Sequence, residues 1–139
     1  MEDLYLSIKR FYPEQWENLI IDDFFHAHYY ERYLTLSKVI PQDFVIVDYG
    51  CGNACQSFFF REFDRYFGID IVERVRLELP NTVYLDFLEP EVLIKNYGLN
   101  LDKTFAIASN IRWSKQTNIA DKLASNFRAN FTNLFSLKA

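Results

Sequence analysis

The stretch that decides the fold runs from Phe44 to Asp70 and reads FVIVDYGCGNACQSFFFREFDRYFGID. It opens with a continuous run of β-forming apolar residues, Phe44 to Val47, which is typical of a parallel strand covered on both faces. A tight turn with two glycines follows, and then a segment predicted to be helical from Asn53 to Tyr66. A second predicted strand, Phe67 to Ile71, carries the carboxylate of Asp70. This order of elements is that of a nucleotide-binding βαβ unit.

The composition is that of an ordinary globular domain. The chain has 139 residues, of which 50% are hydrophobic and 24% are charged, with 14 Phe and 9 Tyr. That length predicts one domain with a single hydrophobic core. The net charge of −4 does not indicate broad nucleic-acid binding, which depends on Lys and Arg neutralising phosphates.

Helices and strands alternate along the rest of the chain. Residues 1–43 are predicted to be helical, with Pro13 opening a second helix and one long or two shorter helices between Trp16 and Ile40. After residue 71 we expect a short helix (73–79), a third strand (82–85), a helix (89–97) ended by Gly98, a fourth strand (104–108) and a helix (118–137). We therefore predict one domain over 1–139, with a helical region (1–43), a βα core (44–113) and a C-terminal helix (114–139).

The sequence offers little for metal binding or disulfide formation. Cys51 and Cys55 are four residues apart within the glycine turn and the start of the following helix, which suits neither a disulfide framework nor a complete zinc site. His26 shares a helix face with Asp22 but not with His28. We predict reduced cysteines and no metal site.

The glycine turn is the candidate ligand-binding element of the sequence. Gly50 and Gly52 allow close approach of a ligand to the backbone, and a helix start behind them aims N–H groups across the strand ends. Asp70 follows Asp48 by 22 residues and falls at the end of the next strand, where a carboxylate can accept both hydroxyl hydrogen bonds of a ribose. Two glycines alone make nothing more than a tight turn, but here two apolar strands and carboxylates at three strand ends accompany them. A dinucleotide fingerprint would place a third glycine where this chain has Cys55.

The motif V-D-Y-G-C-G-N-A, followed by G-I-D, resembles motifs I and II of the class I S-adenosylmethionine-dependent methyltransferases. The resemblance covers roughly residues 44–113 and departs from the family pattern at Ala54, which replaces the last glycine. It implies a Rossmann-like three-layer sandwich with a mostly parallel sheet, here of about four strands in the order 3-2-1-4, together with the N-terminal helices and the C-terminal helix.

On this resemblance the cofactor is S-adenosylmethionine. The loop from Asp48 to Ala54, including Gly50, Cys51 and Gly52, would wrap the methionine part. Asp70 would hold the ribose hydroxyls, with Ile71 against the adenine. The pair Asp86-Phe87, at the end of the third strand, matches the position at which the family commonly addresses the adenine amino group.

The sequence indicates catalytic residues less clearly than it indicates cofactor-binding residues. The fourth strand ends in S-N-I-R-W, where amino-methylating members of the family often carry Asn/Asp-Pro-Pro-aromatic. Asn110 and Trp113 keep the first and fourth positions and are the candidate catalytic residues, although both prolines are missing and a strand end with a packing tryptophan is the simpler explanation. Methyl transfer depends mainly on alignment of donor and acceptor, so no general base is required.

Three functional hypotheses follow. The first is a minimal methyltransferase acting on an unidentified acceptor, and the second is a non-catalytic methyltransferase-like module that binds the cofactor or a protein partner. A nicotinamide-dependent oxidoreductase is disfavoured by Asp48, by Cys55 and by the lack of a Tyr-x-x-x-Lys pair.

An open edge at the fourth strand would favour a homodimer through that strand and the C-terminal helix. No apolar run is long enough to cross a membrane and no signal peptide begins the chain, so we expect a cytoplasmic protein.

Overall fold

A five-stranded parallel sheet forms the centre of the molecule. The computed structural model describes residues 3–21, 23–109 and 119–134. Its strands are β1 (Val45–Tyr49), β2 (Arg65–Ile69), β3 (Thr82–Leu85), β4 (Thr104–Ala108) and β5 (Phe131–Asn133). They lie in the order β3-β2-β1-β4-β5, and every neighbouring pair is parallel. The predicted Rossmann-like α/β class is confirmed, and the predicted order 3-2-1-4 continues into a fifth strand.

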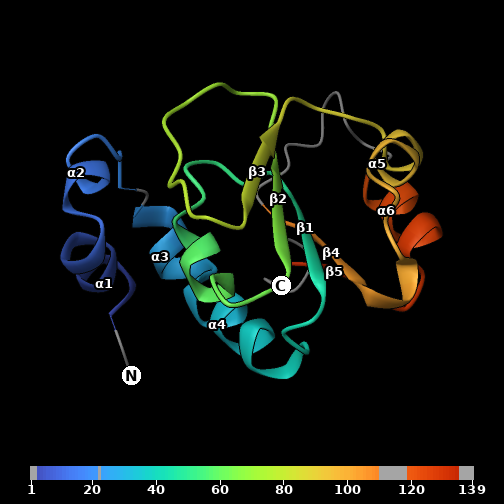
Figure 1. The fold of residues 1–139 in the computed structure, drawn as a ribbon, viewed down its shortest axis with the longest axis horizontal. Coiled ribbons are helices and arrows are strands. Elements are labelled where there is room, and N and C mark those ends of the chain that lie inside the picture. The colour runs from blue at the N-terminus through green and yellow to red at the C-terminus, as the bar shows by residue number, and fades with distance from the viewer. Residues whose placement is uncertain (1–2, 22, 110–118, 135–139) are drawn as a thin grey trace.

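Helices cover both faces of this sheet, as Figure 1 shows. Successive residues of β1 enter two separate cores, with Ile46 in one and Val47 in the other, because side chains alternate across a strand. One core lies under α1 (Leu4–Phe11), α2 (Pro13–Trp16), α3 (Asp23–His28), α4 (Tyr30–Val39) and the 3-10 helix η1 (Cys55–Phe60). The other lies under α5 (Pro90–Tyr97), the 3-10 helix η2 (Leu101–Lys103) and α6 (Ile119–Phe127). The result is the predicted three-layer arrangement.

The N-terminal helices begin where the sequence predicts. Asp3 caps α1, its Oδ1 accepting hydrogen bonds from the backbone N–H groups of Tyr5 at 2.9 Å and Leu6 at 3.2 Å. Pro13 is the first residue of α2, a position where the missing N–H costs nothing. The region from Trp16 to Ile40 contains two shorter helices, α3 and α4, rather than one long one.

The helix predicted from Asn53 to Tyr66 is wrong in type and length. Only the 3-10 helix η1 forms there, and β2 starts already at Arg65. Five of the six residues of η1 are buried, so this segment has no polar face to turn toward water. The tighter 3-10 geometry is typical of such short pieces.

The short helix predicted from Glu73 to Leu79 is also wrong, since this connection between β2 and β3 is irregular. Its backbone is instead held by hydrogen bonds from distant residues. The Gln15 side chain donates to the Glu78 carbonyl at 2.8 Å and accepts from the Glu78 N–H at 2.7 Å. The Leu77 N–H donates to the Asn53 carbonyl at 2.9 Å. These bonds replace those that a helix would supply.

At the C-terminal end, the predicted helix from Asn118 to Leu137 is too long. Helix α6 ends at Phe127, and Arg128 takes the left-handed φ of 59°, a conformation that ends a helix. The chain then forms β5 beside β4. The edge of β4 that was expected to be open is therefore covered, and the sheet extends beyond residue 113.

Glycine is required at position 68 by close packing between β2 and β3. Gly68 pairs with Tyr84 across the two strands, and a β-carbon at Gly68 would lie 2.6 Å from two carbons of the Tyr84 ring. The ring is anchored, because the Tyr84 hydroxyl donates to the Leu77 carbonyl. A larger residue must displace this ring.

We predict that Gly68→Ala lowers the free energy of unfolding by about 1–3 kcal/mol, the usual cost of overpacking a core. Urea denaturation of the wild type, Gly68→Ala, Tyr84→Leu and the double variant measures the effect. The free energy of unfolding of the double variant should fall by much less than the sum of the two single decreases, because leucine leaves free the space that the Tyr84 ring occupies. Strict additivity would contradict the proposed clash.

Candidate functional site

The carboxyl ends of the central strands define the candidate site. From β1 the chain moves outward through β2 and β3, and it then returns to the other side of β1 to form β4. The crevice between β1 and β4 is the topological switch point, where open parallel α/β sheets bind ligands. The glycine loop, residues 50–54, lies there directly after β1.

A carboxylate ties this glycine loop to the next strand. Asp70 follows β2 directly, and its Oδ2 accepts a hydrogen bond from the Gly52 N–H at 2.8 Å. Its Oδ1 accepts from the Val72 N–H at 2.9 Å. Asp70 is partly exposed, and each oxygen keeps a further lone pair for a ligand. Gly52 has a φ of +59°, which glycine adopts without strain.

Ala54 takes a left-handed backbone conformation, which glycine adopts more readily than alanine. Its φ is 58° and its ψ is 30°, in the left-handed region. This conformation costs a residue with a β-carbon about 1 kcal/mol relative to glycine. The methyl group is fully buried in the core on the α4 side, so packing offsets part of the cost. Gly50, Gly52 and Ala54 therefore all have positive φ in this loop.

Asp48 is the last but one residue of β1, lies beneath the loop and is fully buried. Its Oδ1 accepts a hydrogen bond from the Tyr33 hydroxyl at 2.7 Å. Its Oδ2 accepts from the Gln56 side-chain amide at 2.9 Å and from the Tyr66 hydroxyl. The Tyr33 hydroxyl is also hydrogen-bonded to Ser109 Oγ at 2.7 Å, at the end of β4. This polar network joins α4, η1 and the three central strands.

Burial is the largest cause of the pKa shifts of Asp48, Tyr33 and Tyr66. It raises the pKa of Asp48 from 3.8 to about 6, although the hydrogen bonds from Tyr66, Gln56 and Tyr33 act in the opposite direction. Burial and the charge of Asp48 raise the pKa values of Tyr33 and Tyr66 well above their usual value. Both tyrosines therefore stay protonated and act as donors to the carboxylate.

The N-terminal helical region covers the glycine loop. The Asn53 side chain donates to the Ile20 carbonyl at 2.5 Å and fixes this cover to the loop. Phe25 of α3 and the following Tyr29 line a cavity of about 20 Å³, whose other walls are loop residues, Gln56 and Ser109. That volume holds about one water molecule.

The other residues predicted to contact the cofactor lie at the end of β3 and directly after Asp70. Asp86 is exposed and Phe87 is partly buried. The Phe87 ring packs edge-on against Tyr49, the last residue of β1, with ring centroids 5.9 Å apart. Ile71 keeps 61% of its surface exposed, beside Asp70.

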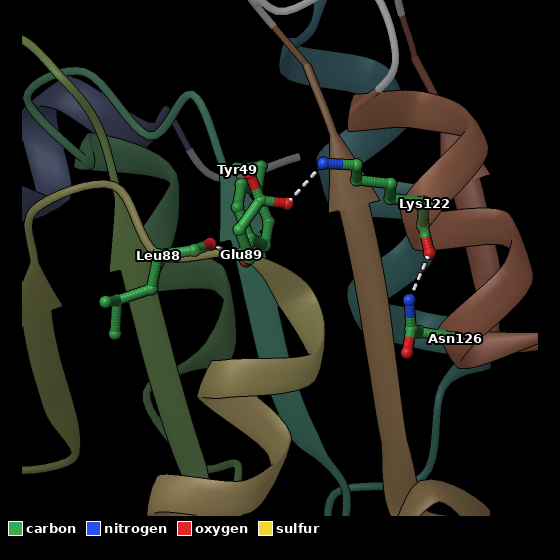
Figure 2. Close-up of polar contacts among 5 residues, drawn as sticks. All are labelled: Tyr49, Leu88, Glu89, Lys122 and Asn126. Atoms are coloured by element: carbon green, nitrogen blue, oxygen red, sulfur yellow. Dashed lines mark hydrogen bonds and ion pairs between the residues drawn. The ribbon is translucent and has the colours of Figure 1, made fainter.

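Polar contacts of Tyr49 and Lys122 join β1 and α6 to the start of α5 (Figure 2). The Tyr49 hydroxyl donates to the Leu88 carbonyl at 2.5 Å, and Lys122 Nζ lies 2.7 Å from Glu89 Oε2. The Asn126 side chain donates to the Lys122 carbonyl at 2.8 Å. These contacts hold the start of α5, and with it the Asp86-Phe87 pair, against the central strands.

The cysteines and histidines have structural roles. Cys51 and Cys55 are buried and unbridged, and burial raises the pKa of the Cys51 thiol. The His26 ring packs between Tyr5 and Tyr30, with centroid distances of 5.2 and 4.9 Å. Within residues 3–21, 23–109 and 119–134, no group of His, Cys, Asp or Glu side chains could hold a metal ion.

The structure brings Gly50, Cys51, Gly52 and Asp70 together, with Asp48 directly beneath them. The predicted catalytic residues Asn110 and Trp113 lie outside the described residues. Sequence reasoning missed the donors to Asp48: Tyr33, Gln56, Tyr66 and, through Tyr33, Ser109. No local signal pairs Tyr33 with a carboxylate 15 residues later.

Comparisons with known proteins support the fold. No protein-family model matches the chain, and no curated protein matches it. A solved structure from Anaeromyxobacter dehalogenans, provisionally named a type II methyltransferase, has 22% sequence identity and a TM-score of 0.51. The match covers 74% of this chain and 45% of that one, so this chain spans less than half the length of its structural neighbour. The likeness shows a methyltransferase-like, Rossmann-like fold.

We predict that Asp48 makes stability depend on pH. Because the pKa of Asp48 is about 6 when folded and 3.8 as its ordinary value, the folded state binds this proton more tightly. Its contribution to the free energy of unfolding is fully present below pH 4 and is lost as pH rises through 6, by about 3 kcal/mol. Urea denaturation from pH 4 to 7.5 measures the loss. Asp48→Asn should remove this part of the pH dependence, and an unchanged profile would refute the assignment.

Proposed function

We propose that this chain binds S-adenosylmethionine at the carboxyl edge of β1 and β2, as a methyltransferase-like protein that transfers a methyl group to an acceptor not yet identified. The observation that carries the proposal is the bond from the Gly52 N–H to Asp70. It places a shaped glycine loop beside a partly exposed carboxylate at a topological switch point, an arrangement suited to a nucleoside. When bound, S-adenosylmethionine would supply a methyl group already activated on a sulfonium.

The residues around the loop suit the parts of this ligand. The free lone pairs of Asp70 would accept the two ribose hydroxyls. The exposed side chain of Ile71 would pack against the adenine, and Asp86 with Phe87 would address its amino group from the end of β3. The backbone of Gly50, Cys51 and Gly52 would border the methionine part. The protein's task is to orient the donor and to exclude water.

Asp48 has an indirect role in this proposal. All three of its protein donors lie within the buried network, and its side chain has no exposed surface. It would hold the loop in place from beneath, as a positioning residue, rather than touch the ligand. Tyr33 and Tyr66 share this role.

A second candidate function is a non-catalytic methyltransferase-like module, acting through cofactor binding or protein interaction. One observation favours it. The cavity of about 20 Å³ between the loop and α3 is far smaller than a typical small-molecule pocket of about 300 Å³ or more. Binding of a methionine group there would require the α3 segment to move away from the loop.

Isothermal titration with S-adenosylmethionine, S-adenosylhomocysteine and NAD tests cofactor binding. We expect heat with the first two and none with NAD. Asp70→Asn should weaken both interactions about tenfold or more, because a charge-assisted hydrogen bond to the ribose is lost. Asparagine keeps an oxygen that can accept from Gly52, so the loop is largely preserved.

Asp64→Asn is the matched control, since Asp64 is exposed and lies at the opposite end of β2. It should leave both affinities unchanged. The absence of heat with the two adenosyl compounds would refute the proposed function. Binding without transfer of a labelled methyl group to nucleic acid, protein or small-molecule fractions would favour the second candidate.

A homodimer and a cytoplasmic location belong to the same proposal. No helix among the described residues is long and apolar enough to cross a membrane. Because β5 covers β4, the C-terminal part of a dimer interface would be the edge of β5 and helix α6. We predict a dimer in sedimentation velocity at micromolar concentration, and a monomer at every concentration would refute it.

A further inference from the structure

A groove with a basic rim lies on the face of the sheet that α1, α4 and η1 cover. Helices α1 and α4 both pack against η1, and a cavity of about 280 Å³ lies among the three. We call it the basic groove. Its apolar walls are Leu4, Leu34, Phe58 and Phe59, and its two cations are Lys38 and Arg61.

The apolar part of the basic groove belongs to the rigid core. Leu4 and Phe58 are almost completely buried, with 1% and 2% of their surfaces exposed, while Leu34 and Phe59 pack against the same core. The groove is thus a preformed depression in a packed surface. Its volume approaches the lower end of small-molecule pockets, about 300 Å³.

The cations at its rim are not neutralised by the protein. Among the described residues, neither Lys38 nor Arg61 forms an ion pair, and no Asp or Glu lines the groove. An anion would therefore meet two cations and no opposing carboxylate.

Arg61 is also held in place. Its guanidinium carbon lies 4.1 Å from the centroid of the Phe58 ring, and its Nη1 donates to the Phe58 carbonyl at 2.9 Å. A guanidinium has five N–H donors, so most remain for a ligand. Because the planar group is already oriented, less side-chain entropy is lost when it binds a carboxylate.

We propose that the basic groove binds an aliphatic carboxylate, with its alkyl chain along Leu34 and Phe59 and its headgroup between Lys38 and Arg61. The apolar walls fit an alkyl chain, and the two cations select a negative headgroup. The groove would serve a small effector, because none of the residues that line it lines the cavity at the glycine loop.

Isothermal titration of the full chain with sodium octanoate tests this proposal, with acetate and octyltrimethylammonium as comparison ligands. Octanoate should bind at least tenfold more tightly than either, because acetate lacks the alkyl chain and octyltrimethylammonium has the wrong charge. In two-dimensional ¹H–¹⁵N NMR spectra, the amide signals that shift should include those of Ser37, Phe59 and Arg61.

The double variant Lys38→Gln/Arg61→Gln should weaken octanoate binding about tenfold. Lys95→Gln is the control, since this exposed lysine lies on α5 on the other side of the sheet and should change nothing. Ser37→Trp, which fills the groove, should abolish binding while the melting curve shows a folded protein. Equal affinity for octanoate and octyltrimethylammonium, or octanoate binding unchanged by the double variant, would overturn the proposal.

Discussion

The buried carboxylate of Asp48 is the group on which the rest of the structure depends. It draws hydrogen bonds from α4, η1 and β2 to one point at the end of β1, and through Tyr33 it reaches β4 as well. A buried carboxylate without partners would cost several kcal/mol, so these elements must meet correctly for the chain to fold. The glycine loop begins directly above this point. Its shape is therefore a consequence of core packing.

The candidate site combines a rigid loop with a close cover. The bond from Gly52 to Asp70 fixes the loop to β2, whereas the bond from Asn53 to Ile20 fixes the cover to the loop. The proposed nucleoside binding depends on the first bond, and the second limits the space above the loop. A ligand that enters must give more favourable contacts than the packing of Phe25 and Tyr29 that it displaces. Affinity would therefore depend on both the loop and the N-terminal helices.

Much of the fold could be predicted from local pattern, because central parallel strands are continuous apolar runs and Asp70 follows one of them. The strand from Thr104 to Ala108 was placed correctly for the same reason. Other features depend on distant contacts. The left-handed turn at Arg128, which lets β5 form, replaces a helix that the spacing of Phe127 and Phe131 favoured. The donors to Asp48 could not be predicted, since tyrosines in an aromatic-rich core carry no local sign of their partner.

The side chain of Gln15 has a consequence for the folding of the chain. By bonding both backbone groups of Glu78, it joins residues 63 positions apart and replaces the helix missing between β2 and β3. Helix α2 cannot detach without leaving these two groups without protein partners, so its local opening is coupled to that of residues 71–81. These two bonds lie at exposed groups, where water can replace them, so each contributes about 1 kcal/mol to holding α2 against the segment after Asp70.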